Sequence, residues 1–222
     1  MHKIRGLILK DILELKAYKK NLLIIIVIYS FLILSQRGDS MVSVGATMIM
    51  LVISMLAINT FHYDDKTKTD RYLLTLPVTK KEIVLSKYIL SILSVISGAI
   101  IGTIISVLLT YLKYKMIPNI EELLSSVLGG MIAVSFIGSV QLPSIYKYGA
   151  EKGRMFIYVI ALIIFILGNV VMMFDLNINL SFLEKYDYLL PIACFLLIAI
   201  MYLISYIISL KIYQKKELWN MI

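Results

Sequence analysis

Charged residues are scarce in this sequence, and their scarcity excludes most classes of soluble protein. Of the 222 residues only 16% are charged and 60% are hydrophobic, and the mean hydropathy is +0.89. Soluble domains carry about 25% charged and about 45–50% apolar residues. The composition therefore predicts an all-α integral membrane protein, in which residues 1–222 form a single transmembrane domain.

The groups that usually carry catalysis or bind metals are also nearly missing. The sequence has two histidines, His2 and His62, and one cysteine, Cys194. These numbers exclude an internal disulfide, a thiolate metal cluster and a zinc-binding histidine pair within the membrane. The segment from Gly149 to Gly153 does not match a Walker A motif. We expect no catalytic residue, metal or cofactor in this chain; if ATP drives it, ATP and Mg²⁺ bind to a partner subunit.

Six apolar runs predict six transmembrane helices, at about 22–35, 41–62, 87–112, 120–142, 155–174 and 188–210. The first run covers only about 21 Å at about 1.5 Å per residue, so flanking residues must complete that span. Thr79 with Glu82, and Asn119 with Glu122, have the spacing of helix N-terminal caps for the third and fourth spans. Pro143 begins a short polar break after the fourth. No charged residue falls in the middle of a span, which disfavours a proton-coupled carrier.

The N-terminal segment, residues 1–21, has the pattern of a basic amphipathic helix. Five apolar residues share one side at helical spacing: Ile4, Leu7, Ile8, Ile12 and Leu15. Lys3, Lys10 and Glu14 lie opposite, although Asp11 falls among the apolar residues. We expect this helix to lie in the inner membrane interface; the alternative is a helical extension of the first span.

Lysine and arginine are distributed unevenly between the two sides of the predicted membrane. Eighteen fall in the N-terminal segment, in residues 63–87 and 143–154 and in the C-terminal tail. Only four fall on the other side: Arg37, Lys113, Lys115 and Lys185. The positive-inside rule therefore places both termini in the cytoplasm. The net charge of +8 is explained by this topology and by membrane lipids, and we expect no nucleic-acid partner.

Small and polar residues within the spans have two interpretations each. The third span carries Ser94, Gly98, Gly102 and Ser106 at intervals of four, and the fourth carries Gly130. Such residues let helices approach closely, either within one subunit or at a dimer seam or sliding surface. Asn59, Gln141 and Asn169 are candidates for lining a translocation path, or else satisfy neighbouring backbone groups. The apolar surroundings favour an amphipathic or hydrophobic cargo.

Two polar intervals, 63–86 and 143–154, carry a sequence pattern that resembles a known family. Residues 61–88, FHYDDKTKTDRYLLTLPVTKKEIVLSKY, combine an acidic cluster, an aromatic–leucine run, a Leu-Pro-Val turn and a basic helix entering the third span. This arrangement resembles the cytoplasmic segment of bacterial ABC-2-type permeases. Residues 143–154, PSIYKYGAEKGR, are similar to the second inner loop of that family.

The resemblance implies a permease subunit of an ATP-binding cassette exporter in a bacterial cytoplasmic membrane. Such a subunit pairs with a second permease, identical or paralogous, and with separate ATPase subunits. The two intervals would be coupling loops that contact the ATPase. The implied polar rim and apolar anchors of the first loop are Asp64, Asp65, Lys68, Asp70, Arg71, Tyr72, Leu73, Leu74, Leu76 and Pro77. The second contact would be Tyr146, Lys147, Glu151, Lys152 and Arg154.

Three hypotheses of function remain at this point. The first is export of an amphipathic or hydrophobic cargo such as a peptide, toxin or antimicrobial. The second is an ion-coupled secondary carrier without an ATPase. The third is a non-transporting membrane scaffold or immunity protein. Without the resemblance, the apolar residues of 63–86 are equally well explained by a helix that dips into lipid.

Overall fold

The described residues form helices joined by short turns, with no strand among them. The computed structural model describes residues 2–35, 41–73, 75–115, 119–153, 155–156, 158–159 and 190–215. Four helical segments are long and apolar enough to cross a membrane: Gly45–Thr67, Lys80–Lys113, Leu123–Tyr148 and Pro191–Lys215. The prediction of an all-α membrane protein is therefore confirmed. Most of the fifth predicted span, 155–174, lies outside the described residues.

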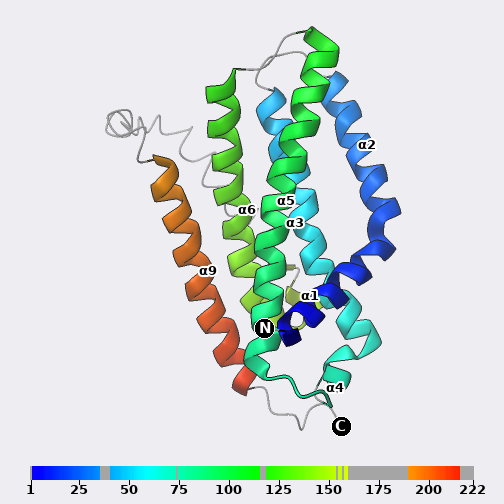
Figure 1. Ribbon diagram of the computed structural model, residues 1–222, viewed down its shortest axis with the longest axis vertical. Coiled ribbons are helices and arrows are strands. Elements are labelled where there is room, and N and C mark those ends of the chain that lie inside the picture. The colour runs from blue at the N-terminus through cyan, green and yellow to red at the C-terminus, as the bar shows by residue number, and fades with distance from the viewer. Residues whose placement is uncertain are drawn as a thin grey trace.

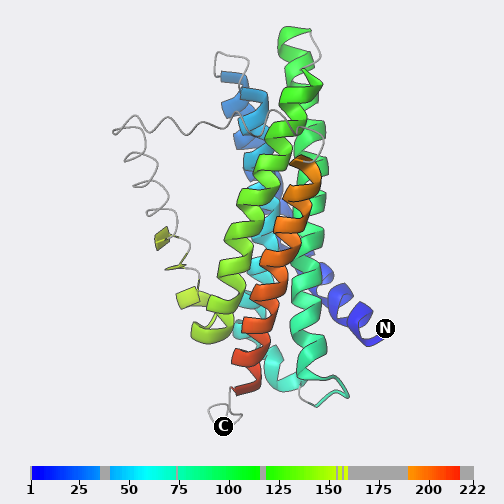
Figure 2. The ribbon, with the colours of Figure 1, turned by 90° about the vertical axis from the view of Figure 1, so that its left-hand side faces the viewer.

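The helices follow one another along the chain in a simple order. They are α1 (His2–Leu15), the 3-10 turn η1 (Lys16–Tyr18), α2 (Lys19–Ser35), α3 (Met41–Thr67), α4 (Thr69–Leu73), α5 (Lys80–Tyr114), α6 (Ile120–Tyr148) and α9 (Leu190–Lys215). Helices α3, α5, α6 and α9 stand side by side along the long axis, with α2 beside α3 (Figures 1 and 2). Helix α1 crosses the lower part of α5, and α4 lies at that same end of the bundle (Figure 1).

Helices α3 and α5 approach closely because α5 presents glycine at the contact. A Cβ atom on Gly98 would lie 3.1 Å from the Met50 Cα, and one on Gly102 would lie 2.6 Å from the Ala46 carbonyl oxygen. Real Cβ atoms rarely come this close to backbone, so a larger residue would push the two helices apart. A Cβ atom on Gly130 of α6 would meet a side chain of α3 instead, 2.5 Å from Thr47 Cγ2. At these positions the small residues pack within one subunit.

The α5 helix begins where its capping residues predict. The Thr79 hydroxyl accepts a hydrogen bond from the Glu82 backbone N–H at 3.3 Å, and the Glu82 carboxylate accepts one from the Thr79 N–H at 2.7 Å. This reciprocal pair satisfies two backbone donors that the first turn would otherwise leave open. At the start of α6, Asn119 caps the helix by accepting from the Glu121 N–H at 3.1 Å.

Helix α6 continues beyond the predicted break, so the expectation that Pro143 ends this helix is wrong. The helix includes Pro143 and runs to Tyr148. Proline has no N–H to donate to the carbonyl four residues earlier, here that of Ser139. The Ser205 hydroxyl of α9 donates to this carbonyl at 2.5 Å. A hydrogen bond from a neighbouring helix is a usual way in which a membrane helix tolerates proline.

The predicted orientation of the N-terminal helix needs correction. Leu7 and Asp11 face the protein, with exposed fractions of 8% and 1%, whereas Leu9, Ile12 and Leu13 are exposed. Asp11 therefore does not interrupt a lipid-facing stripe. It lies on the face of α1 that packs against α5 and α3.

Candidate functional site

A compact projection, residues 68–79, joins α3 to α5 at one end of the bundle. Lys68 adopts a left-handed conformation with φ 51°, which ends α3 and turns the chain into the short helix α4. Successive turn hydrogen bonds follow, from the Thr75 N–H to the Tyr72 carbonyl at 3.0 Å and from the Leu76 N–H to the Leu73 carbonyl at 3.2 Å. The projection is therefore a folded element rather than an extended linker.

The structure exposes most of the predicted contact residues whose side chains it describes. In the first interval these are Asp65, Lys68, Tyr72, Leu76 and Pro77, and Tyr72 retains 64% of its surface. In the second interval Lys147, Glu151 and Lys152 are exposed. Leu74 and Arg154 lie outside the described residues, and for Asp70 and Arg71 only the backbone, in α4, is described.

Three of the predicted contact residues are buried within the chain, and their contact with an ATPase stays a prediction. Asp64, Leu73 and Tyr146 have exposed fractions of 5%, 3% and 7%. Leu73 belongs to the core, and the Tyr146 ring packs edge-on against Phe61 with ring centres 5.4 Å apart. These side chains pack against other parts of the same chain.

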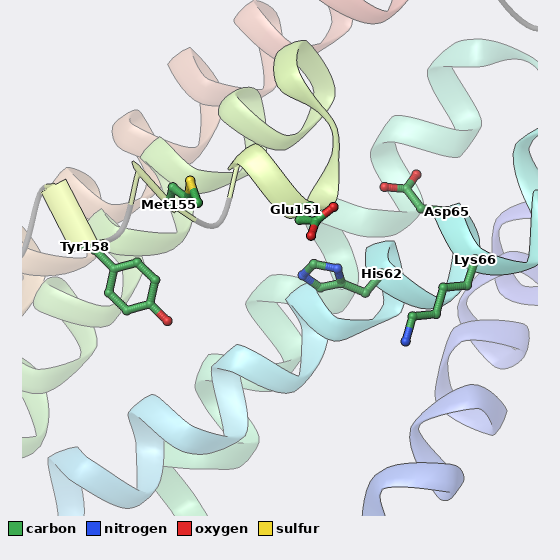
Figure 3. A pocket seen from close by; sticks show the side chains of 6 residues that line it. All are labelled: His62, Asp65, Lys66, Glu151, Met155 and Tyr158. Atoms are coloured by element: carbon green, nitrogen blue, oxygen red, sulfur yellow. The ribbon is translucent and has the colours of Figure 1, made fainter.

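The two intervals contact each other directly. The Asp65 carboxylate accepts a hydrogen bond from the Ala150 N–H at 3.0 Å. Gly153 lets the residues after α6 fold back, because a Cβ there would lie 2.7 Å from the Ile145 Cα. A cavity of about 580 Å³ opens beside this contact (Figure 3). It is lined by His62, Asp65, Lys66, Glu151, Met155 and Tyr158.

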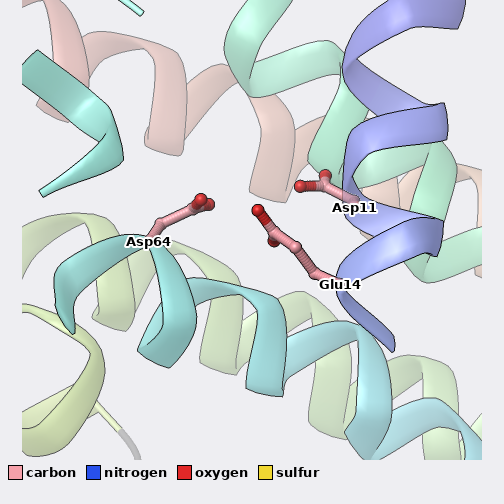
Figure 4. A group of neighbouring side chains, drawn as sticks. All are labelled: Asp11, Glu14 and Asp64. Atoms are coloured by element: carbon pink, nitrogen blue, oxygen red, sulfur yellow. The ribbon is translucent and has the colours of Figure 1, made fainter. Parts of the chain in front are cut away.

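A group of buried and half-buried charges, which we call the charge cluster, underlies the projection. It consists of Lys10, Asp11 and Glu14 of α1, Asp64 of α3 and Lys87 of α5. The Lys87 ammonium donates to Asp64 Oδ2 at 2.5 Å, to Asp11 Oδ1 at 2.9 Å and to the Thr60 hydroxyl at 3.0 Å. Figure 4 shows the three carboxylates turned toward one another. The cluster joins α1 to the two helices that flank the projection.

Sequence reasoning did not identify the charge cluster. The available signals were Asp11 on the apolar side of an amphipathic helix and Lys87 at the start of an apolar run. Each is unusual alone, because a charged residue is rarely buried unless it is paired. Their pairing across 76 positions of sequence became visible only in the fold.

A chain of hydroxyl groups connects α5, α6 and α9. The Ser205 hydroxyl has one hydrogen, which it donates to the Ser139 carbonyl, so Tyr88 must donate to Ser205 at 2.6 Å. Ser209 then donates to the Tyr88 oxygen at 2.7 Å. All four groups are buried, and such chains strengthen one another in a medium of low dielectric.

The residues predicted to line a path are placed only in part. Gln141 is fully buried on α6, and neither polar atom of its amide has a hydrogen-bond partner within the part of the chain that the structure describes. Asn59 is half-buried on α3, and Asn169 lies outside the described residues. Their contact with a cargo stays a prediction.

The described helices define a multi-pass, all-helical membrane protein. A family model for ABC-2 family transporter proteins matches residues 6–214. The chain belongs to this family, whose members are transport subunits of the membrane that normally work with ATPase subunits. No curated protein and no solved structure matches the chain.

Proposed function

We propose that this chain is the permease subunit of an ATP-binding cassette exporter and that its ATPase partner docks on the projection between α3 and α5. The observation that carries the proposal is the exposed tip of a firmly held loop. Tyr72 and Leu76 retain 64% and 36% of their surface, among the exposed polar residues Asp65 and Lys68. Apolar anchors within a polar rim are typical of protein interfaces.

The base of the projection supports this role because contacts within the chain hold it without a partner. Leu73 is packed in the core, the Thr79–Glu82 capping box holds the start of α5, and the Lys3 ammonium donates to the Pro77 carbonyl at 2.5 Å. A preorganised surface loses less conformational entropy on binding. The proposed anchors are therefore Tyr72 and Leu76, with Leu73 as their support.

The connections of the projection suggest how ATPase movement reaches the membrane. The projection leads directly into α3 and α5, and the charge cluster joins both helices to α1. Through Asp65 and Ala150 it also holds the second interval. A shift of the ATPase would then move these elements together as a rigid body. Opening a path between two permease subunits is the proposed outcome.

The finer topology belongs to the same proposal. Helix α2 has 17 residues, or about 26 Å at about 1.5 Å per residue, and would form the first of six spans. The exposed Leu9, Ile12 and Leu13 of α1 would lie in the inner membrane interface, beside the exposed basic residues Arg5 and Lys16. The projection and both termini would be cytoplasmic, in a bacterial membrane. The cargo would be amphipathic or hydrophobic and would move outward.

The test is binding of the cognate ATPase co-expressed with this chain. Replacing both Tyr72 and Leu76 with Asp should weaken binding at least about 30-fold, because an interface anchor contributes about 2 kcal/mol or more. The control is Ile120→Asp, which puts one of these two negative charges on an exposed apolar residue, 75% exposed, at the start of α6. Full binding by the double variant, or the absence of any bound ATPase, contradicts the proposal. Peptide-stimulated ATP hydrolysis in vesicles tests the cargo class.

A further inference from the structure

The charge cluster contains more negative than positive groups. Its three carboxylates and two ammonium groups leave one surplus negative charge when all five are ionised. Asp11 and Asp64 have exposed fractions of 1% and 5%, and Lys87 also 5%. An uncompensated charge is unfavourable in such a position, because burial removes the water that would stabilise it.

The hydrogen bonds of the cluster show where the surplus lies. Lys87 uses its three N–H groups on Asp11, Asp64 and Thr60. The Lys10 ammonium lies 2.6 Å from Asp64 Oδ1, 3.2 Å from Asp11 Oδ1 and 3.5 Å from Glu14 Oε1. Of these three Lys10 contacts, the one to Asp64 is a hydrogen bond and the other two are ion pairs. Two buried oxygens, Asp11 Oδ2 and Glu14 Oε2, have no hydrogen-bond partner among the described residues.

Both oxygens without a donor belong to carboxylates of α1. One oxygen from each of Asp11, Glu14 and Asp64 lies within 4.8 Å of the others (Figure 4). A metal ion in this space would face two ammonium groups, whose like charge opposes it. A proton needs no additional space, removes one negative charge and turns one carboxyl oxygen into a donor.

We infer that the charge cluster binds one proton on the carboxyl pair of α1, with Glu14 as the carrier, and that α1 packs on α3 and α5 in this protonated form. The inference concerns this chain alone and does not depend on the proposed ATPase partner. The surrounding charged groups are Lys10 and Asp11 on the same helix, Asp64 on α3 and Lys87 on α5. Glu14 is the proposed carrier because, among the three carboxylates, it makes the longest contact to an ammonium group.

The direction of the Glu14 pKa agrees with this assignment. Burial raises the pKa of Glu14 above its ordinary value of 4.5; Lys10 and Lys87 oppose the shift, and Asp64 and Asp11 add to it. A carboxyl group whose pKa is raised on folding stabilises the fold while it is protonated. The stabilisation is complete below pH 4.5 and is lost as the pH rises through the raised pKa.

The experiment compares the full chain with Glu14→Gln, which keeps the shape of the protonated group but cannot ionise. Melting midpoints are measured from mildly acidic to mildly alkaline pH in choline chloride, without alkali cations. We expect the midpoint of the unsubstituted chain to fall relative to that of Glu14→Gln as the pH rises. At alkaline pH the variant should be higher by about 2–4 °C. Glu121→Gln is the matched control, because Glu121 is exposed at the start of α6, and it should follow the unsubstituted chain.

Infrared spectroscopy gives a readout that does not depend on stability. A protonated carboxyl C=O band should persist above pH 4.5, the ordinary pKa of a glutamate, and should be absent from Glu14→Gln. Three results would each overturn the inference. One is a midpoint of Glu14→Gln that is lowered equally at every pH, as expected for a simple ion-pair partner of Lys10. Another is the absence of the carboxyl band. The third is a melting midpoint that falls at alkaline pH and recovers when sodium chloride is added, which would indicate a bound metal ion.

Discussion

The Ser205 hydroxyl should stabilise the fold chiefly by donating to the Ser139 carbonyl, because Pro143 has no N–H to donate to it. Replacing Ser205 with Ala leaves the Ser139 carbonyl without this donor and removes one partner of the Tyr88 hydroxyl. Tyr88 keeps its bond to Ser209. An unsatisfied buried acceptor costs about 1–3 kcal/mol, and single interhelical bonds in membranes average about 0.6 kcal/mol. We expect Ser205→Ala to lower the free energy of unfolding by about 1–2 kcal/mol.

The same substitution should matter less when residue 143 can donate. Pro143→Ala restores an N–H opposite the Ser139 carbonyl, so Ser205→Ala then removes only the contact with Tyr88. The cost should fall to about 0.5 kcal/mol, which leaves a coupling of about 1 kcal/mol between the two positions. Pro143→Ala alone should leave the stability unchanged or raise it.

The four variants of this cycle can be compared by thermal unfolding with a thiol-reactive dye. Cys194 is the only cysteine, and it is half-buried on α9. A loss of about 1–2 kcal/mol corresponds to a midpoint about 2–8 °C lower. Ser144→Ala is the matched control, since the Ser144 hydroxyl bonds only within its own helix among the described contacts, to the Val140 carbonyl at 2.8 Å. If Ser205→Ala lowers the stability equally with Pro143 present and in the Pro143→Ala variant, the Ser205 hydroxyl does not compensate for the missing N–H of Pro143.

Two further predictions concern packing and capping. Gly102→Ala should lower stability by about 1–3 kcal/mol, because its Cβ would lie 2.6 Å from the Ala46 carbonyl oxygen. Gly129→Ala, with nothing within 4 Å of the added Cβ, should be neutral or stabilising by up to about 1 kcal/mol. Similar melting midpoints for the two variants would contradict the close contact of Gly102 with α3. Thr79→Ala should lower the free energy of unfolding by about 1 kcal/mol because it removes the cap of α5, whereas Thr79→Ser keeps the hydroxyl and should retain most of that stability. Chemical denaturation of both variants tests this, and an Ala variant as stable as the Ser variant would show that the cap is unimportant.

Features that depend on neighbouring residues were predictable from the sequence, and features that depend on distant contacts were not. The start of α5 was predicted correctly because Thr79 and Glu82 are three residues apart and complete their bonds locally. The continuation of α6 through Pro143 was missed because it involves a hydroxyl group 66 residues away. The burial of Asp64 was missed for the same reason, since its partners Lys10 and Lys87 come from two other helices. Hydrophobic patterning identified the membrane helices but could not identify which polar residues meet between them.

The bond between Asp65 and Ala150 has a consequence for exchanging parts between relatives. A chimera that replaces only residues 68–79 would combine the projection of one protein with the α1 and post-α6 contacts of another. The unit that can be transplanted intact is larger and discontinuous: it includes the cluster residues of α1, the chain from Asp64 to Lys87 and the turn at residues 149–153. Partner specificity should therefore transfer between permeases only when these three pieces are exchanged together.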